Sequence, residues 1–209
     1  MGIRAPVLEA AHPGEARFSI QHRSYVLGAV GEAVAPLEAF VNELFQDAAD
    51  ATNADPVPGT AVRLGAVGRP ARLMAAYWNS TDEGERVRTL DKYDAARLFA
   101  GCPRQDRGRL LDQDVPRVIA LRNWSVHYRP QSYSRDEPDL RAKVEDARAR
   151  IPENALMAGS NNPWFPDKAL GAGCVRWAVQ TVRAFVDEFV DAIGCAADFW
   201  DLSMYDEQP

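Results

Sequence analysis

The spacing of the apolar residues between Arg23 and Asp50 constrains the fold of this chain more than any other feature. These residues recur at steps of three and four, and they are Val26, Val30, Val34, Leu37, Val41, Leu44 and Phe45. That period matches the 3.6 residues per turn of an α-helix, so all of them lie on one face. The pattern predicts a long amphipathic helix. Pro36 is expected to kink or break it, because proline lacks the N–H that a helix interior uses.

Similar spacing recurs along the rest of the chain and indicates an all-helical fold. Helices are expected over residues 72–78, 87–99, 114–129, 139–150 and 170–193. The last of them places one stripe of apolar side chains, which are Ala178, Val182, Phe185, Val186, Phe189 and Ile193. No segment alternates apolar and polar residues as a half-buried strand does. We therefore expect an all-α protein, an antiparallel bundle of four to five helices with additional short helices and loops.

Two of these helices carry further local signals. Asp114 is expected to cap the helix that ends before Pro130, with Pro116 in its first turn, where the missing N–H costs little. Charges alternate at helical spacing over residues 139–150, which is typical of a solvent-exposed helix. The helix that starts at Asp114 therefore has a defined beginning and a defined end.

The remaining segments are expected to be irregular. Residues 1–22 are predicted to form an N-terminal arm and residues 195–209 a C-terminal tail. Residues 52–70 contain three prolines and three glycines and are expected to form a loop. Two prolines in residues 161–166 bar a helix or a central strand, so a shaped loop is expected there. No repeat or change of composition marks a boundary, and residues 1–209 are expected to form a single domain.

The composition is that of a soluble globular protein. Of the 209 residues, 46% are hydrophobic and 26% are charged, which suffices for a buried core. No apolar stretch approaches the roughly 18 residues of a membrane span, so no membrane association is expected. The N-terminus has no apolar signal core, and Cys102, Cys174 and Cys195 have no paired spacing. These features together predict a cytoplasmic protein.

The net charge of −6 argues against a protein that coats nucleic acid, because such proteins carry a basic face. It leaves room for an enzyme with one local basic cleft. Arginines far outnumber lysines in the sequence, and a GC-rich coding sequence explains that bias as well as phosphate recognition does. The bulk charge therefore does not identify a substrate.

The candidate catalytic residues lie near the end of the helix expected over residues 114–129. Arg122 and Asn123 are adjacent, and His127 follows Asn123 by four positions. An arginine with a histidine five positions later also occurs at Arg17 and His22, so that pair alone is a weak pattern. The adjacent asparagine lowers the number expected by chance about thirtyfold. The set Arg122, Asn123 and His127 is therefore the strongest candidate site in the sequence.

Helical geometry adds a condition on this set. Arg122 falls on the inward stripe one turn after Val118, so it needs a carboxylate partner, a cleft or a subunit interface. Asn123 and His127 lie on one ridge, whereas Arg122 and His127 differ by about 140° on an ideal helix. The two converge if the helix end loosens toward Pro130. They also converge if a second subunit of a two-fold dimer presents its own set opposite.

These residue types suit RNA cleavage without a metal. A histidine near neutral pH can take the proton of a ribose 2′-hydroxyl or give one to the leaving 5′-oxygen. An arginine can hold the phosphate and stabilise its developing charge. An asparagine can orient the imidazole. A purely structural interpretation is also open, in which the arginine pairs with a carboxylate and the histidine packs at a bundle surface.

The motif resembles that of the HEPN superfamily, α-helical bundles marked by Arg-x(4–6)-His, often with asparagine after the arginine. Here it reads Arg122-Asn123-x-x-x-His127. The resemblance continues downstream through Asn162-Pro163-Trp164-Phe165-Pro166-Asp167-Lys168, Leu170-Gly171-Ala172-Gly173-Cys174 and Trp177-Ala178-Val179. It covers about residues 114–194.

The resemblance implies a four- to five-helix bundle that forms a homodimer with the motif at its interface. It also implies metal-independent endoribonuclease activity without a cofactor, in some members as a toxin with an antitoxin or other protein partner. Arg122, Asn123 and His127 take the catalytic roles, and Tyr128 and Arg129 are expected to bind the RNA substrate. Many members of the superfamily are not nucleases. The alternative is therefore a non-catalytic HEPN-like binding or scaffold module.

Other kinds of site are less well supported. His12 and His22 lie ten positions apart, away from His127, and no cysteine stands at ligand spacing, so no metal site is expected. Cys174 is expected to be a buried thiol rather than a nucleophile. Residues 171–173 lack the strand and third glycine of a dinucleotide loop. Trp164 and Phe165 are expected to anchor their loop in the core, with stacking on a base as the alternative.

Overall fold

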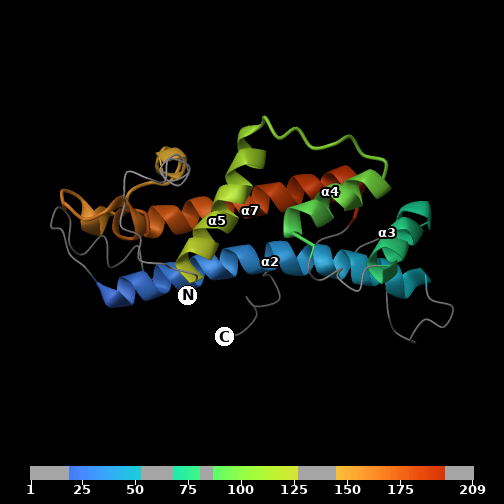
Figure 1. The fold of residues 1–209 in the computed structure, drawn as a ribbon, viewed down its shortest axis with the longest axis horizontal. Coiled ribbons are helices and arrows are strands. Elements are labelled where there is room, and N and C mark those ends of the chain that lie inside the picture. Colours follow the sequence, from blue (N-terminus) through green and yellow to red (C-terminus); the bar gives the residue numbers. More distant parts are fainter. Residues whose placement is uncertain (1–18, 53–67, 81–86, 127–144, 196–209) are drawn as a thin grey trace, which may run out of the picture. The chain divides into compact units, whose positions relative to one another are not determined.

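The computed structural model describes residues 19–52, 68–80, 87–126 and 145–195, and the helices in it contain most of them. The long helices in these ranges are α2 (Ile20–Thr52), α3 (Gly68–Ser80), α4 (Thr89–Phe99), α5 (Leu110–Val126) and α7 (Ala172–Ile193). Two short turns, η2 (Ala155–Met157) and η3 (Trp164–Lys168), precede α7 (Figure 1). The described residues contain no strand. The all-α prediction is confirmed.

Helix α2 is longer and starts earlier than predicted. Ser19 precedes it, and the Ser19 Oγ accepts a hydrogen bond of 3.2 Å from the backbone N–H of His22. This is the N-cap geometry that satisfies one of the first N–H groups of a helix. Residues 20–22 are therefore helical rather than part of an arm, and His22 is only 2% exposed. Residues 1–18 of the predicted arm lie outside the described residues.

Pro36 does not break α2, which continues from Ile20 to Thr52 as one helix with the proline inside. A proline in a helix interior costs roughly 3 kcal/mol. Burial compensates here, since each large apolar side chain removed from water stabilises the fold by about 1.5–3 kcal/mol. The neighbours Val34 and Leu37 are 2% and 0% exposed. The buried stripe therefore holds the helix together across the proline.

The chain divides into two compact units that share α2 and α7. Met1–Pro36 and Arg107–Ala184 form unit 1, and Leu37–Asp106 and Phe185–Pro209 form unit 2. Neither unit is a continuous stretch of chain. The single domain expected for residues 1–209 stays a prediction.

The core of unit 1 joins α2, α5 and the start of α7. Its buried residues are Val26, Val30, Leu121, Ala147, Ile151, Trp164, Ala169, Leu170, Ala172 and Cys174. Trp124 and Phe165 pack at its edge with their rings 5.6 Å apart and nearly perpendicular. Residues 139–150 were expected to form an exposed helix, of which only residues 145–150 are described. Residues 145–148 are helical, but Ala147 is 3% exposed because it belongs to this core.

The core of unit 2 is aromatic and centres on Tyr93 of α4. The Tyr93 ring lies 4.6 Å from the ring of Phe189 and 5.0 Å from that of Phe185. Its hydroxyl donates a hydrogen bond of 2.8 Å to the carbonyl oxygen of Leu37. The adjacent Lys92 is 1% exposed and donates a hydrogen bond of 2.7 Å to Asn42 Oδ1. A buried phenol and a buried ammonium group thus both bond to α2.

The segment before α7 is organised by Asn154. Its side-chain N–H groups donate to the carbonyl oxygens of Asp167 and Leu170 at 3.1 and 3.0 Å, and its Oδ1 caps η2 by accepting from Leu156 N–H. A Cβ on Gly171 would lie 2.7 Å from the Cα of Asn154. Residues 164–168 form a helical turn where only a loop was expected, although Phe165 itself has extended backbone angles. The turn forms because Asn154 holds its carbonyl groups.

The length and hydropathy of helix α2 bear on the expectation that no segment could span a membrane. Among the described residues it is the one helix long and apolar enough to cross a membrane, with an 18-residue window of mean hydropathy 1.3. The expectation that no stretch approaches that length was therefore wrong. The core helix of a soluble protein meets the same criterion, and 39% of that window is buried inside the protein.

Candidate functional site

The predicted catalytic set lies at the C-terminal end of α5. This helix begins at Leu110, four residues before the predicted cap Asp114, and its buried residues are Asp114, Val115, Val118 and Leu121. Arg122 and Asn123 are both half-buried in the last described turns. His127, Tyr128 and Arg129 lie outside the described residues, as does the expected end of the helix before Pro130. The meeting of Arg122 with His127 therefore stays a prediction.

The position of Arg122 agrees with the helical geometry expected from the sequence. It follows Leu121, which is 0% exposed, and lies one turn after Val118, which is also 0% exposed. The side chain therefore emerges beside the core of unit 1 rather than from the exposed side of α5. A guanidinium at such a place loses part of its hydration and is held by neighbouring groups. That setting suits either a catalytic arginine or a structural one.

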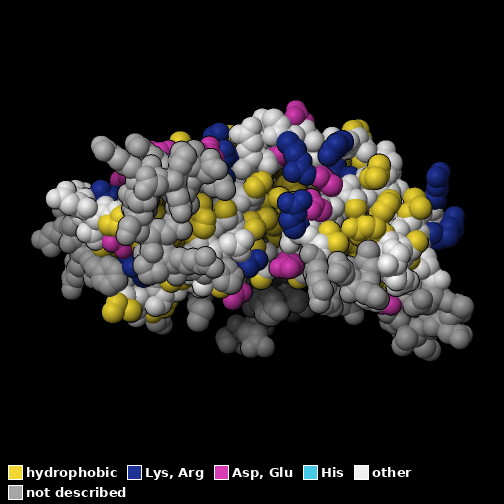
Figure 2. Space-filling model, in the orientation of Figure 1, with side chains coloured by type: hydrophobic (Ala, Val, Ile, Leu, Met, Phe, Trp, Pro, Cys, Tyr) yellow, Lys and Arg dark blue, Asp and Glu magenta, His cyan; other side chains and the backbone are white. Residues whose placement is uncertain are grey.

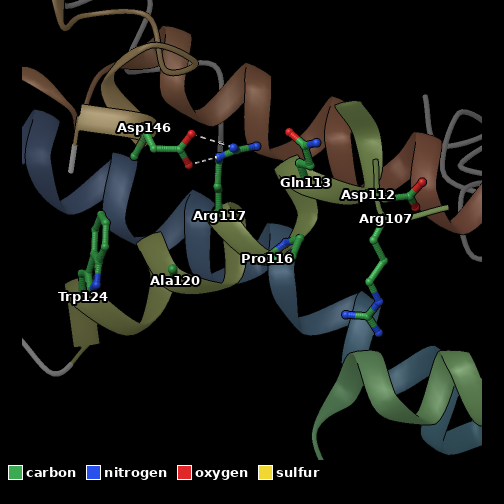
Figure 3. Close-up of a pocket in the computed structure, with 9 residues that line it drawn as sticks. Arg107, Asp112, Gln113, Pro116, Arg117, Ala120, Trp124 and Asp146 are labelled. Carbon is green, nitrogen blue, oxygen red and sulfur yellow. Dashed lines mark hydrogen bonds and ion pairs between the residues drawn. The ribbon is translucent and has the colours of Figure 1, made fainter. Parts of the chain in front are cut away.

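A cavity of about 510 Å³ lies on a different face of α5, within unit 1. We call it the α5 cavity. The α5 residues that line it recur at each turn along one side of the helix, and they are Asp112, Gln113, Pro116, Arg117, Ala120 and Trp124 (Figure 3). Arg122 precedes Trp124 by two residues, a rotation of roughly 200°. The α5 cavity and the predicted catalytic arginine therefore lie on opposite sides of the helix.

Arg117 is the central charge of the α5 cavity. Its Nε and one terminal nitrogen donate to both carboxylate oxygens of Asp146 at 2.5 and 2.7 Å, and its other terminal nitrogen donates to Asp114 Oδ1 at 2.8 Å. Figure 3 shows Asp146 reaching Arg117 from the opposite wall. The hydrogen bond from Arg117 lowers the pKa of Asp146, and the same bond raises the pKa of Arg117. Both groups are therefore charged at neutral pH.

The charges around Arg117 balance. Arg150 Nε lies 3.8 Å from Asp114 Oδ1, so two guanidinium groups face two carboxylates. On the described surface, Lys and Arg side chains likewise lie among Asp and Glu side chains (Figure 2). The described face seen there has no continuous basic track of the kind that RNA-binding surfaces use.

None of these cavity residues was among the predicted site residues. The spacing of Asp114 and Arg117, three positions apart on one helix, was a visible signal for an ion pair. Asp146 carried no such signal, because it is 29 positions from Arg117 and reaches it only through the tertiary fold.

The structure bears out the expectations for Cys174 and for the aromatic loop. Burial raises the pKa of the Cys174 thiol to about 12 and that of Cys195 to about 11, so neither is a thiolate at neutral pH. Trp164 is 8% exposed and belongs to the core, which leaves its ring inaccessible to a base. Within the described ranges, no group of three His, Cys, Asp or Glu residues is placed to hold a metal ion. No family model, curated protein or solved structure matches the chain.

Proposed function

We propose that this chain is a metal-independent endoribonuclease of the HEPN type, with Arg122, Asn123 and His127 as its catalytic residues. The observation that supports this best is the place of Arg122 and Asn123, half-buried in the last described turns of α5 in an all-helical fold. An arginine beside a core is held in one orientation, which a phosphate-binding group needs. The sequence motif supplies the third residue.

Each residue has a defined role in the proposed reaction. His127 takes the proton of the ribose 2′-hydroxyl, or donates one to the leaving 5′-oxygen. Arg122 binds the phosphate and stabilises the charge that develops on it. Asn123 orients the imidazole, and Tyr128 and Arg129 contact the RNA. The products carry 2′,3′-cyclic phosphate or 3′-phosphate ends, because the nucleophile is the 2′-oxygen of the substrate itself.

The proposed active form is a cytoplasmic homodimer, regulated by an antitoxin or another protein partner. Arg122 and His127 point about 140° apart on an ideal helix, and a two-fold axis brings the arginine of one copy toward the histidine of the other. Mixing Arg122→Ala protein with His127→Ala protein tests this arrangement. A composite site regains activity in the mixed dimer, whereas a site within one chain does not.

Purified protein is expected to cleave single-stranded RNA in the presence of EDTA. Arg122→Ala and His127→Ala should each lower the cleavage rate by at least about 100-fold, the typical contribution of one general acid–base or charge-stabilising group. Both variants should keep the helical circular dichroism signal. The rate is measured with a fluorescently labelled oligonucleotide, and the product ends are identified by mass spectrometry.

The control histidine is His12 rather than His22. Replacing His22 would open a cavity, because its side chain is 2% exposed in α2. His12→Ala removes a histidine outside the motif and should leave the rate unchanged. Equal rates in the wild type and in His127→Ala would mean that the activity belongs to a contaminating nuclease and that the ribonuclease proposal is wrong.

A non-catalytic binding module is the second candidate function, and the α5 cavity favours it. The cavity is large enough for a small molecule, and its charges balance around Arg117. A protein that binds a ligand at the α5 cavity and leaves RNA intact would support this alternative. The ribonuclease proposal predicts cleavage that does not depend on the cavity.

A further inference from the structure

The α5 cavity has the dimensions of a small-molecule site that the proposed ribonuclease chemistry does not use. Its volume is about 510 Å³, within the roughly 300–1,000 Å³ of known ligand pockets. Arg122 lies on the other side of α5, so the predicted catalytic arginine does not line the cavity. Ligand binding at the α5 cavity can therefore be tested separately from the role of Arg122.

One end of the α5 cavity is apolar. Trp124 lines it together with Ala120 and Ala147, and Figure 3 shows the indole at the opposite end from Arg107. The Trp124 ring is half-buried and is packed against Phe165 at 5.6 Å. A ring held in this way offers a fixed surface for an apolar or aromatic body.

The accessible charge beside that surface is a carboxylate. The side chain of Asp146 is 53% exposed, whereas that of Arg117 is 15% exposed and donates to two carboxylates. Arg117 donates one hydrogen bond to each oxygen of Asp146. Since a carboxylate has about four acceptor sites, Asp146 can accept further hydrogen bonds. A cation can therefore reach Asp146 at this end of the cavity, where Arg117 already donates three of its five N–H groups to carboxylates.

Gln113 adds a second acceptor. Its Nε2 donates a hydrogen bond of 3.0 Å to the carbonyl oxygen of Gly108, which holds the amide in place, and its oxygen adds a further acceptor to the lining. Arg107 lies at the far end of the cavity (Figure 3). Acceptors thus border the middle of the cavity, and the indole closes one end.

We propose that the α5 cavity binds a small organic ammonium ion with an aromatic or aliphatic body. The ammonium group donates to the carboxylate of Asp146, and the body lies against Trp124 and Ala120. Aromatic rings attract cations as well as hydrocarbon, so Trp124 contributes to both parts of the ligand. The carboxylate sets the preference for a cation over a neutral molecule of the same shape.

Three probes of one shape test the proposal: phenethylamine, which is a cation, phenethyl alcohol, which is neutral, and hydrocinnamate, which is an anion. Isothermal titration of the full chain should give saturable binding of phenethylamine. Its affinity should exceed that of phenethyl alcohol about tenfold, the value of one charge-assisted hydrogen bond at a partly exposed site. Hydrocinnamate should bind most weakly. Equal affinity for all three probes, or no saturable binding of phenethylamine, would overturn the proposal.

Two variants separate the charge from the cavity. Asp146→Asn should lower the affinity for phenethylamine about tenfold and leave that for phenethyl alcohol unchanged, with Glu145→Gln as the matched control at an exposed neighbouring carboxylate. Ala120→Leu fills the cavity from α5 without removing a polar contact and should abolish binding of both probes. Circular dichroism verifies that each variant is folded. Binding that survives Ala120→Leu would place the ligand elsewhere and refute the proposal.

The binding and cleavage measurements together distinguish a failure of this inference from a failure of the ribonuclease proposal. His127→Ala should bind phenethylamine as the wild type does, because the proposed contacts are made by Asp146, Trp124 and Ala120. A protein that binds the amine but leaves RNA intact loses only the ribonuclease proposal. A protein that cleaves RNA but does not bind the amine loses only the inference about the α5 cavity.

Discussion

At the scale of single residues, Gly171 packs so closely against Asn154 that the structure leaves no room for a side chain at this position. A Cβ on Gly171 would meet Asn154 Cα at 2.7 Å and Asn154 Cβ at 2.9 Å. Real Cβ atoms do not approach backbone so closely. Asn154 cannot yield easily, because its side chain bonds to two carbonyl groups and to the N–H of Leu156. The glycine is therefore required by packing, which explains a motif residue that sequence analysis left without a role.

We predict that Gly171→Ala lowers the free energy of unfolding by about 1–3 kcal/mol, because overpacking forces the Asn154 segment to shift. Gly28→Ala is the matched control. Gly28 lies inside α2 with nothing within 4 Å of its added Cβ, so alanine should stabilise the helix by about 0.5–1 kcal/mol. Urea unfolding followed by circular dichroism measures both. A Gly171→Ala protein as stable as the wild type would show that the Asn154 segment is not rigid.

At the scale of elements, Arg117 fastens α5 to the helical turn at residues 145–148. The two hydrogen bonds to Asp146 cross between these elements, and the third, to Asp114, stays within α5. The side chains of Arg117 and Asp114 are 15% and 11% exposed. Their charges are therefore partly desolvated, and each depends on the other more than a surface pair would.

We predict that Arg117→Met lowers the free energy of unfolding by about 2 kcal/mol. The estimate is below the 3–5 kcal/mol of a fully buried pair, because Asp146 is half exposed. Arg148→Met is the control, since Arg148 and Glu153 form an exposed pair at 3.4 Å that should contribute at most about 0.5 kcal/mol. Equal effects of the two changes would mean that the bond between α5 and the turn adds no stability.

The ion pair between Arg117 and Asp146 also makes the stability of the fold depend on pH in the acid range. The pKa of Asp146 is lowered by its hydrogen bond from Arg117, so the folded state prefers the ionised carboxylate. Its contribution is present above the unfolded pKa near 3.9 and is lost as the pH falls through the lowered folded pKa. The difference in stability between the wild type and Arg117→Met should therefore shrink below about pH 4.

At the scale of the whole molecule, burial of titratable groups makes the fold sensitive to alkali. Burial raises the pKa of Cys174 to about 12 and that of Cys195 to about 11, and it also raises the pKa of Tyr93. The folded state keeps these protons where the unfolded chain loses them. Stability is therefore complete below the unfolded pKa values, near 8.5 for a thiol, and falls as the pH rises toward the folded values.

We predict that Cys174→Ala reduces the loss of stability between about pH 9 and pH 11 by roughly 1.4 kcal/mol per pH unit, the linkage of one proton. At neutral pH the variant should be less stable by about 1 kcal/mol, because a buried sulfur is lost. Urea unfolding at a series of pH values in reducing buffer gives both quantities. Val182→Ala, which removes buried apolar atoms but no titratable proton, is the control and should run parallel to the wild type. If the stability of Cys174→Ala fell with pH in parallel with that of the wild type, the burial of the Cys174 thiol would be contradicted.

The sequence by itself determined the helices, because their signal is local. Apolar spacing predicted residues 170–193 as a helix, and the structure has Ala172–Ile193; α3 contains the segment predicted over residues 72–78, and α4 covers all but the first two residues of 87–99. The place of Arg122 beside the core also followed from the 3.6-residue period. The start of α2 was missed because the cap at Ser19 lies outside the apolar pattern. The spacing of apolar residues and the residue types thus predict where helices form and on which side of its helix a side chain lies.

Only the tertiary structure decided which distant residues meet. Asp146 reaches Arg117 across 29 positions, and Asn154 meets Gly171 at a distance that no local pattern encodes. Helix α2 continues through Pro36 because the burial of its stripe outweighs a local cost. The α5 cavity exists for the same reason: its opposite walls come from segments whose approach depends on the packing of the whole unit. Contacts between distant residues reflect the sum of many weak burial terms, which a linear pattern does not contain.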